Sequence, residues 1–267
     1  MTDQRIGDAL SKVPAVTLGF WIAKIFATTL GETAGDAVTM SWLGETTPGA
    51  STAVSGYLIG TGIFGMILLA LVLLQIRAKQ FHPFLYWATI VASTTAGTTL
   101  ADFATRSLGI GYSGGSILLL GLVLASLGTW NKVEGKISSD QIVTARTEAF
   151  YWITITFSQT LGTALGDWAA DPATLGLGYL GGALLFGGLI VVVALLYFVT
   201  SINRVALFWA AFILTRPLGA TVGDFLDKPL AKGGLNLSRP LASAVLAIAI
   251  VIIVWLTSRR EPDAVSA

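Results

Sequence analysis

The stretch FWIAKIFATTLGETAGD, from Phe20 to Asp36, is the first of four copies of one pattern in this 267-residue chain. The pattern is a tryptophan, then a glycine, a small residue and an aspartate at fixed distances, and an aromatic residue precedes each tryptophan. The later copies begin at Trp87, Trp152 and Trp209 and recur about every sixty residues. The glycine, small residue and aspartate of the four copies are Gly31, Gly35 and Asp36; Gly97, Ala101 and Asp102; Gly162, Gly166 and Asp167; and Gly219, Gly223 and Asp224. A repeat of this period indicates an internally duplicated chain.

The composition is typical of an integral membrane protein. The mean hydropathy is +0.76, and 12% of the residues are charged, whereas soluble domains carry about 25%. The chain has no cysteine, which excludes disulfides and thiolate metal sites, and its one histidine, His82, argues against haem or imidazole-rich centres. With a net charge of +1 we expect no nucleic-acid partner. The polar N-terminus does not resemble a removable signal peptide, so we expect the first apolar segment to remain as a helix.

Eight segments are long and apolar enough to cross a bilayer, which takes about 20 residues per helix. They predict an all-α integral membrane protein, a single transmembrane domain over residues 1–267, built from four two-helix repeats. The predicted spans lie near residues 15–37, 53–75, 83–104, 114–131, 149–168, 180–200, 205–224 and 240–258. The predicted repeats cover approximately 13–76, 82–131, 147–201 and 204–258.

Lysine and arginine are distributed unequally between alternate connections. Ten lie on the side that holds both termini, among them Arg5, Arg259 and Arg260, and four lie on the other side. This bias predicts that both termini are cytoplasmic. Because each repeat has an even number of spans, we expect four parallel repeats around a pseudo-symmetry axis normal to the membrane.

The first helix of each repeat carries a polar stripe that ends in the aspartate. Positions four, seven and eight residues earlier share one helical face, which in hydrocarbon must line the bundle interior or a wet cavity. The predicted pathway residues of this stripe are Thr28, Thr29, Thr94, Thr95, Thr98, Gln159, Thr160 and Thr163. The small residues beside the stripe predict close helix packing, and the apolar second helices predict a lipid-facing layer. A role as anchors at the membrane interface is predicted for Trp21, Trp87, Trp152 and Trp209.

Buried charges distinguish the repeats from one another. Repeat one adds Lys24 and Glu32, and repeat four adds Arg216 beside Pro217, where a helix must kink. The predicted interior carboxylates are Glu32, Asp36, Asp102, Asp167 and Asp224. Five carboxylates against two cations demand protonation, water or a bound cation. Two plainer readings stay open: some charges form ion pairs that fix helix register, and some aspartates cap helix ends in the hydrated interface.

The repeats resemble those of a family of bacterial membrane proteins described as four tandem copies of a repeat of unknown function, each with two transmembrane regions and a tryptophan. The resemblance rests on the Trp-bearing repeats, on Lys12-Val-Pro ahead of Phe20-Trp-Ile-Ala-Lys-Ile, and on Thr28-Thr-Leu-Gly-Glu-Thr-Ala-Gly-Asp36. It covers nearly the whole chain. It implies eight helices in a bacterial inner membrane, and it implies no substrate.

The buried carboxylates favour a membrane transport protein. In this hypothesis the four aspartates and Glu32 bind a cation or exchange protons, and Lys24 and Arg216 are counter-ions in the pathway. Hard oxygen ligands without pathway Cys or His favour a proton, Na⁺ or a divalent ion such as Mg²⁺ or Mn²⁺. The predicted metal ligands are Asp36, Asp102, Asp167 and Asp224. We expect no cofactor beyond the transported cation, and partners limited to the bilayer, an inorganic cation or proton and a second copy of the chain.

Two other classes of function stay open. One is an outward-facing receptor or enzyme for a small molecule, although the chain has no HExxH or nucleophile-elbow motif and we expect no enzyme. The other is a scaffold or assembly protein whose repeat serves only packing.

Within the transport hypothesis, the unequal charges of repeats one and four argue against a symmetric pore and favour coupled transport.

Overall fold

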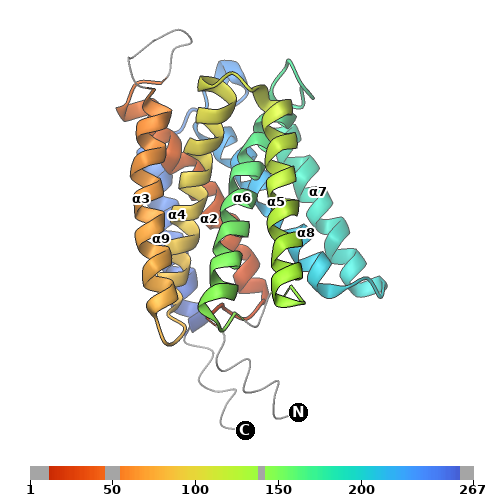
Figure 1. Ribbon diagram of the computed structural model, residues 1–267. Helices are drawn as coiled ribbons and strands as arrows, with labels where there is room; N and C mark the ends of the chain where they lie inside the picture. The colour runs from red at the N-terminus through yellow and green to blue at the C-terminus, as the bar shows by residue number, and fades with distance from the viewer. Residues whose placement is uncertain (1–11, 46–54, 138–141, 259–267) are drawn as a thin grey trace.

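The computed structural model describes residues 12–45, 55–137 and 142–258, and within them the chain is helical without strands. Eight long α-helices are joined by short connections (Figure 1). They are α2 (Leu18–Asp36), α3 (Gly56–Arg77), α4 (Pro83–Asp102), α5 (Gly111–Glu134), α6 (Ala145–Ala170), α7 (Gly178–Val199), α8 (Arg204–Asp227) and α9 (Arg239–Ser258). Three residues of the orientation count lie outside the described residues: Arg5, Arg259 and Arg260.

Local signals fix where several helices begin and end. The hydroxyl of Thr17 accepts a hydrogen bond from the backbone N–H of Phe20 at the start of α2, and Asn203 caps α8 in the same way. Two inner helices continue past their aspartates as short π-helices, η1 (Ala37–Trp42) and η2 (Phe103–Ser107). Such π-helical turns are frequent at functional sites.

Four helices, α2, α4, α6 and α8, form an inner ring in which each packs on two neighbours. The glycine five residues before each aspartate lies where two neighbouring inner helices approach most closely. A Cβ added there would lie 3.0 Å or less from the next helix, where it would meet the residue eight positions before that helix's aspartate. The pairs are Gly31 with Thr94, Gly97 with Gln159, Gly162 with Arg216, and Gly219 with Thr28. The last pair returns to α2, so the contacts close, and the predicted packing role of the small residues is confirmed.

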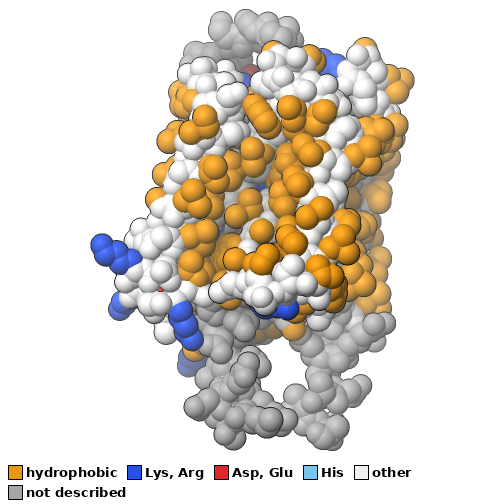
Figure 2. All heavy atoms as spheres, turned by 90° about the vertical axis from the view of Figure 1, so that its right-hand side faces the viewer, with side chains coloured by type: hydrophobic (Ala, Val, Ile, Leu, Met, Phe, Trp, Pro, Cys, Tyr) orange, Lys and Arg blue, Asp and Glu red, His pale blue; other side chains and the backbone are white. Residues whose placement is uncertain are grey.

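The remaining helices form an outer layer with a regular offset. Each second helix packs on the first helix of the following repeat: α3 on α4, α5 on α6, α7 on α8, and α9 on α2. Their outward side chains are large, apolar and exposed, such as Ile117, Leu184 and Val199, and hydrophobic side chains are spread over the height of the face in Figure 2. The prediction of an apolar outer layer is therefore confirmed.

Five helices, α3, α5, α7, α8 and α9, are long and apolar enough to cross a membrane. The threonine-rich α2, α4 and α6 are not among them, because their polar stripes lower their hydropathy. Four of the five are the exposed outer helices, so apolar surface surrounds the inner ring. This arrangement identifies the chain as an all-helical membrane protein.

Equivalent residues of the inner helices form layers along the ring, because every fourth residue returns to nearly the same helical face. Counted back from the aspartates, the layers are Glu32, Thr98, Thr163 and Ala220 at four residues; Thr28, Thr94, Gln159 and Arg216 at eight; Lys24, Ile90, Ile155 and Phe212 at twelve; and Phe20, Tyr86, Tyr151 and Phe208 at sixteen. All of them except the half-buried Phe208 are buried. The inner ring is therefore packed and contains its polar residues near the aspartates.

Candidate functional site

The four repeated aspartates lie at one end of the inner ring, which we call the Asp end, and they form two pairs. All four are buried. Arg106 bridges the pair from α4 and α6, with Nε 3.0 Å from Asp102 Oδ1 and Nη2 3.1 Å from Asp167 Oδ2. The sequence predicted one metal-binding set of four aspartates, but this guanidinium sets Asp102 and Asp167 apart from Asp36 and Asp224.

The ammonium group of Lys228 joins the second pair. Its Nζ lies 2.8 Å from Asp224 Oδ1 and 3.8 Å from Asp227 Oδ1, and it also contacts Asp36 Oδ2. Burial lowers the pKa of Lys228, but the carboxylates of Asp224 and Asp36 outweigh burial and raise this pKa well above its ordinary value. Lys228 therefore stays charged at neutral pH.

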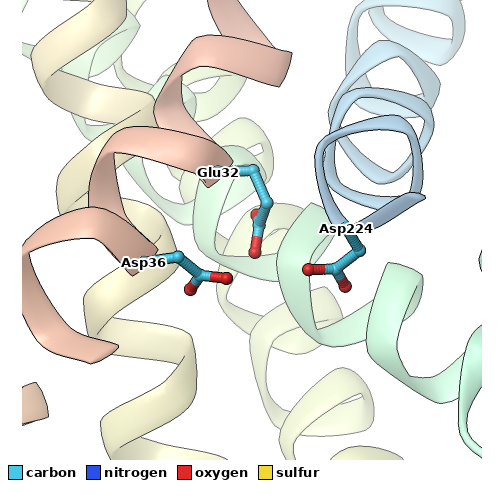
Figure 3. Close-up of side chains that lie close together, drawn as sticks. All are labelled: Glu32, Asp36 and Asp224. Atoms are coloured by element: carbon cyan, nitrogen blue, oxygen red, sulfur yellow. The ribbon is translucent and has the colours of Figure 1, made fainter. Parts of the chain in front are cut away.

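Three carboxylates from two inner helices converge beside Lys228. Glu32 and Asp36 of α2 and Asp224 of α8 point toward one another (Figure 3), and one oxygen of each lies within 4.8 Å of the others. All three are buried, and Asp36 Oδ1 has no hydrogen-bond partner among the described residues. We call these three residues the carboxylate group. Oxygen ligands of this kind suit protons and hard cations such as Mg²⁺ and Mn²⁺.

Arg216 lies at the centre of the ring, next to the carboxylate group. Its Nη2 lies 3.0 Å from Glu32 Oε2 and donates hydrogen bonds to the hydroxyls of Thr98 at 2.5 Å and Thr163 at 2.6 Å. The side chain is fully buried. Residues from all four inner helices thus meet at one guanidinium, and the predicted counter-ion Arg216 has Glu32 as its carboxylate partner.

Lys24 forms no ion pair with Glu32 or with another described carboxylate. It is fully buried, its Nζ lies 4.1 Å from the centre of the Phe212 ring, and it has no hydrogen-bond partner in the described part of the chain. The equivalent positions of the other repeats hold Ile90, Ile155 and Phe212. Arg216 reaches Glu32 from the neighbouring helix α8, which leaves Lys24 in an apolar layer.

The hydroxyl groups of the polar stripe mostly bond to the backbone. One set donates to a carbonyl four residues earlier in its own helix: Thr29, Thr95 and Thr160. A second set also donates to a carbonyl of a neighbouring inner helix: Thr28 and Thr94. Both polar atoms of the Gln159 side chain lack partners among the described residues. Of the predicted pathway residues, Thr98 and Thr163 therefore have the closest link to the charged centre.

Aromatic side chains close the opposite end of the ring, which we call the Trp end. The aromatic residue before each tryptophan contacts the tryptophan of a neighbouring repeat in the ring, with ring centroids 5.6 to 6.2 Å apart. The pairs are Phe20–Trp87, Tyr86–Trp152, Tyr151–Trp209 and Phe208–Trp21. The buried tryptophans, at 2–5% exposure, are Trp87, Trp152 and Trp209. Packing between repeats accounts for the burial of these three tryptophans, and their role as interfacial anchors stays a prediction.

A cavity of about 1440 Å³ opens at the Asp end. Three tyrosines in its wall each follow a glycine at the start of an outer helix: Tyr57, Tyr112 and Tyr179. Arg106 and Lys228 also line the cavity. Because Lys228 contacts Asp36 and Asp224, its side chain separates the cavity from the carboxylate group.

The sequence prediction missed Asp227, and it counted Arg106 and Lys228 only with the basic residues of the connections. Their spacing carried a signal, because Arg106 and Lys228 each follow an aspartate by four residues, the spacing of helical ion pairs. Arg239 adds a further contact, with Nε 3.3 Å from Asp227 Oδ2. Addition of these three residues and Arg239 changes the predicted set of five carboxylates and two basic side chains to six and five. Charge balance alone no longer demands a bound cation.

Comparison with known proteins gives a family for the chain. A family model described as a Repeat of Unknown Function (DUF347) matches four times, at residues 19–81, 85–136, 150–203 and 207–263. No curated protein and no solved structure matches the chain. Since the four matches cover most of the sequence and coincide with the four tryptophan-bearing repeats, the chain belongs to the family of the Repeat of Unknown Function (DUF347).

Proposed function

We propose that this protein is a membrane transporter in which the cargo cation, or the proton coupled to its transport, binds the carboxylate group. The observation that carries the proposal is the convergence of Glu32, Asp36 and Asp224 beneath a cavity that opens at the Asp end. Ionisable residues inside a membrane domain are costly and commonly mark ion pathways. Three carboxylates within 4.8 Å repel one another unless they share protons or cations.

We place all eight helices across a bacterial inner membrane, as four parallel repeats around an axis normal to the bilayer. The support is the equivalence of the contacts, because the same glycine position and the same aromatic pair recur at all four steps of the ring. The lysine and arginine bias puts the termini and the Trp end on the cytoplasmic side. The cavity then faces outward.

The closed axis supports coupled transport over an open pore. Arg216 fills the centre of the ring, and aromatic residues close the Trp end. A cation that enters the cavity therefore approaches the carboxylate group from one side, with the Lys228 side chain between them, as in one state of an alternating-access transporter. The hard oxygen ligands favour Mn²⁺, Mg²⁺ or a coupled proton as the ion.

The cavity supports a second candidate, an outward-facing receptor for a small organic cation. Its volume of about 1440 Å³ exceeds the roughly 300–1,000 Å³ of common ligand pockets. Tyrosine rings attract organic cations, and Tyr57, Tyr112 and Tyr179 surround this space. A receptor would bind its ligand without flux, and binding would depend on the tyrosines more than on Glu32.

Flux measurements in proteoliposomes test the proposal. Vesicles loaded with metal-sensitive and pH-sensitive dyes would receive Mn²⁺, Mg²⁺, Ca²⁺ or Na⁺, and wild type would be compared with Glu32→Gln, Asp36→Asn and Asp224→Asn. The matched control is Asp171→Asn, since Asp171 lines the same cavity but lies outside the carboxylate group.

We expect flux of one cation or of protons in wild type and in the Asp171 control, and loss of at least about tenfold in each variant of the carboxylate group, because each removes a charged ligand. Equal flux in folded variants and wild type would refute the assignment of the site. No flux of any ion, together with tyrosine-dependent binding of an organic cation, would favour the receptor.

A further inference from the structure

The carboxylate group already holds a cation, and that cation belongs to the protein. The ammonium of Lys228 lies 2.8 Å from Asp224 Oδ1, contacts Asp36 Oδ2 and is 3.7 Å from Met40 Sδ. Only 7% of Lys228 is exposed. The place between Asp36 and Asp224 is therefore built to accept one positive charge about the size of an ammonium ion.

A second observation shows that Lys228 leaves carboxylate oxygens of the site without a partner. Asp36 is fully buried, and its Oδ1 has no hydrogen-bond partner among the described residues. Glu32 directs an oxygen to within 4.8 Å of Asp36 and Asp224, while its other contacts are with Arg216 and Thr98. Ligand atoms for a cation of higher charge thus remain in place beside the ammonium.

The backbone around Lys228 is fixed, but its side chain borders open space. Lys228 is the first residue after α8, and its carbonyl accepts a hydrogen bond from the N–H of Asn236 at 2.9 Å. The N–H groups of Leu235 and Leu237 donate to carbonyls at the end of α8 at 2.7 and 2.9 Å. Since Lys228 also lines the cavity, rotation of its four-carbon side chain can move the ammonium out of the carboxylate group without moving the backbone.

The charges around the site prevent the ammonium and a divalent cation from occupying it together. Asp224, Asp36 and Asp227 surround the ammonium, and Arg239 lies against Asp227 with Nε 3.3 Å from Oδ2. A divalent cation that bound among these groups while Lys228 remained would lie within a few ångströms of a like charge, which both would resist. Cation and ammonium are therefore mutually exclusive occupants.

We infer that Lys228 is a tethered cation that occupies the carboxylate group when cargo is absent and that an incoming inorganic divalent cation displaces into the cavity. This inference rests on the proposed function. Its consequence is that the site is never an empty cluster of negative charge, so arrival of cargo and departure of the ammonium are one exchange. The ammonium stays charged throughout, and the carboxylate group only exchanges the ammonium for the incoming cation.

Binding of Mn²⁺ to the purified full-length protein in detergent, followed through the electron paramagnetic resonance signal of free Mn²⁺, tests the inference. The variants are Lys228→Met and Lys228→Gln, which remove the ammonium, and Lys228→Arg, which keeps a positive charge. The control is Lys232→Met, since Lys232 lines the same cavity and forms no ion pair with a described carboxylate. Thermal unfolding identifies any variant that does not fold.

We expect Lys228→Met or Lys228→Gln to bind Mn²⁺ at least about tenfold more tightly than wild type. If the Lys228 ammonium fills the site about 90% of the time, only about 10% of the sites are free, and the apparent affinity of wild type for Mn²⁺ is about tenfold lower. Lys228→Arg and Lys232→Met should bind like wild type. Unchanged or weaker binding in both neutral variants, with binding still lost in Asp36→Asn, would overturn the tethered cation and leave the proposed function standing. No Mn²⁺ binding in wild type or in the neutral variants would overturn the tethered cation and would exclude Mn²⁺ as the cargo of the proposed transporter.

Discussion

A methyl group added at Gly219 tests the closure of the inner ring, because this glycine joins the fourth repeat to the first. A Cβ at Gly219 would lie 2.2 Å from Thr28 Oγ1 and 2.7 Å from the Thr28 carbonyl carbon. Carbon atoms in contact prefer about 3.5–4.0 Å, and the Thr28 backbone cannot rotate away. The substitution Gly219→Ala must therefore push α8 from α2 by about 1 Å, the difference between these distances.

The expected loss of stability combines two opposite effects. Overpacking of a tight contact costs about 1–3 kcal/mol. We expect a cost in the upper half of this range, because the added methyl group meets the Thr28 backbone. Replacing a helical glycine by alanine returns about 1 kcal/mol. The net loss is about 1–2 kcal/mol, or a decrease in Tm of about 2–8 °C for a chain of this size.

Gly62 provides the matched control. It lies in the outer helix α3, and a Cβ there would have no heavy atom within 4 Å. Gly62→Ala should therefore keep the helical gain and raise Tm slightly. Thermal unfolding of both variants in one detergent, followed by tryptophan fluorescence, measures the difference. Equal Tm values for the two variants, or a Gly219→Ala protein more stable than wild type, would refute the closed ring.

Three further substitutions test the interior charges and hydrogen bonds by the same unfolding assay. Lys24→Met should stabilise the protein by about 1–3 kcal/mol, because a buried amine without a partner is costly; a loss of stability would reveal a partner. Tyr151→Phe removes the 2.6 Å hydrogen bond to Tyr86 and should cost about 1–3 kcal/mol, whereas Tyr197→Phe, on the half-exposed Tyr197, should cost almost nothing. Arg106→Met leaves two buried carboxylates without a bridge and should cost about 2 kcal/mol or more. Changing both Asp102 and Asp167 to Asn in the Arg106→Met chain should restore part of the lost stability. A triple variant no more stable than Arg106→Met would contradict the bridge.

The layered interior was predictable from the sequence because it depends on helical periodicity within each repeat. The threonines four and eight residues before the aspartates were expected to face inward, and they do. The same count of four, carried further back, leads to Lys24 and to the aromatic layer at the Trp end. The helical period within one repeat therefore predicts the order of the polar and aromatic layers along the ring.

The partners between repeats were not predictable, because spacing along one helix says nothing about the facing helix. Lys24 and Glu32 share one helix face, yet Arg216 reaches Glu32 from α8 and Lys24 meets the Phe212 ring. Arg106 and Lys228 stand just past predicted spans. The orientation count placed them among the four basic residues of the outer side, whereas in the structure they bridge aspartates. The three buried tryptophans look like interface anchors in sequence because their burial comes from aromatic residues of other repeats.

The offset between inner and outer helices has a consequence for biosynthesis. Among the described helices, α2 is the first to leave the ribosome, and α9, which packs on its outer side, is the last. About 200 residues of translation separate the two, which at about 5–20 residues per second takes on the order of 10–40 s. During that interval the charged face of α2 must be sheltered by the insertion machinery or by the α4 that follows it, and a chain truncated before α9 would leave the first repeat open to proteolytic quality control.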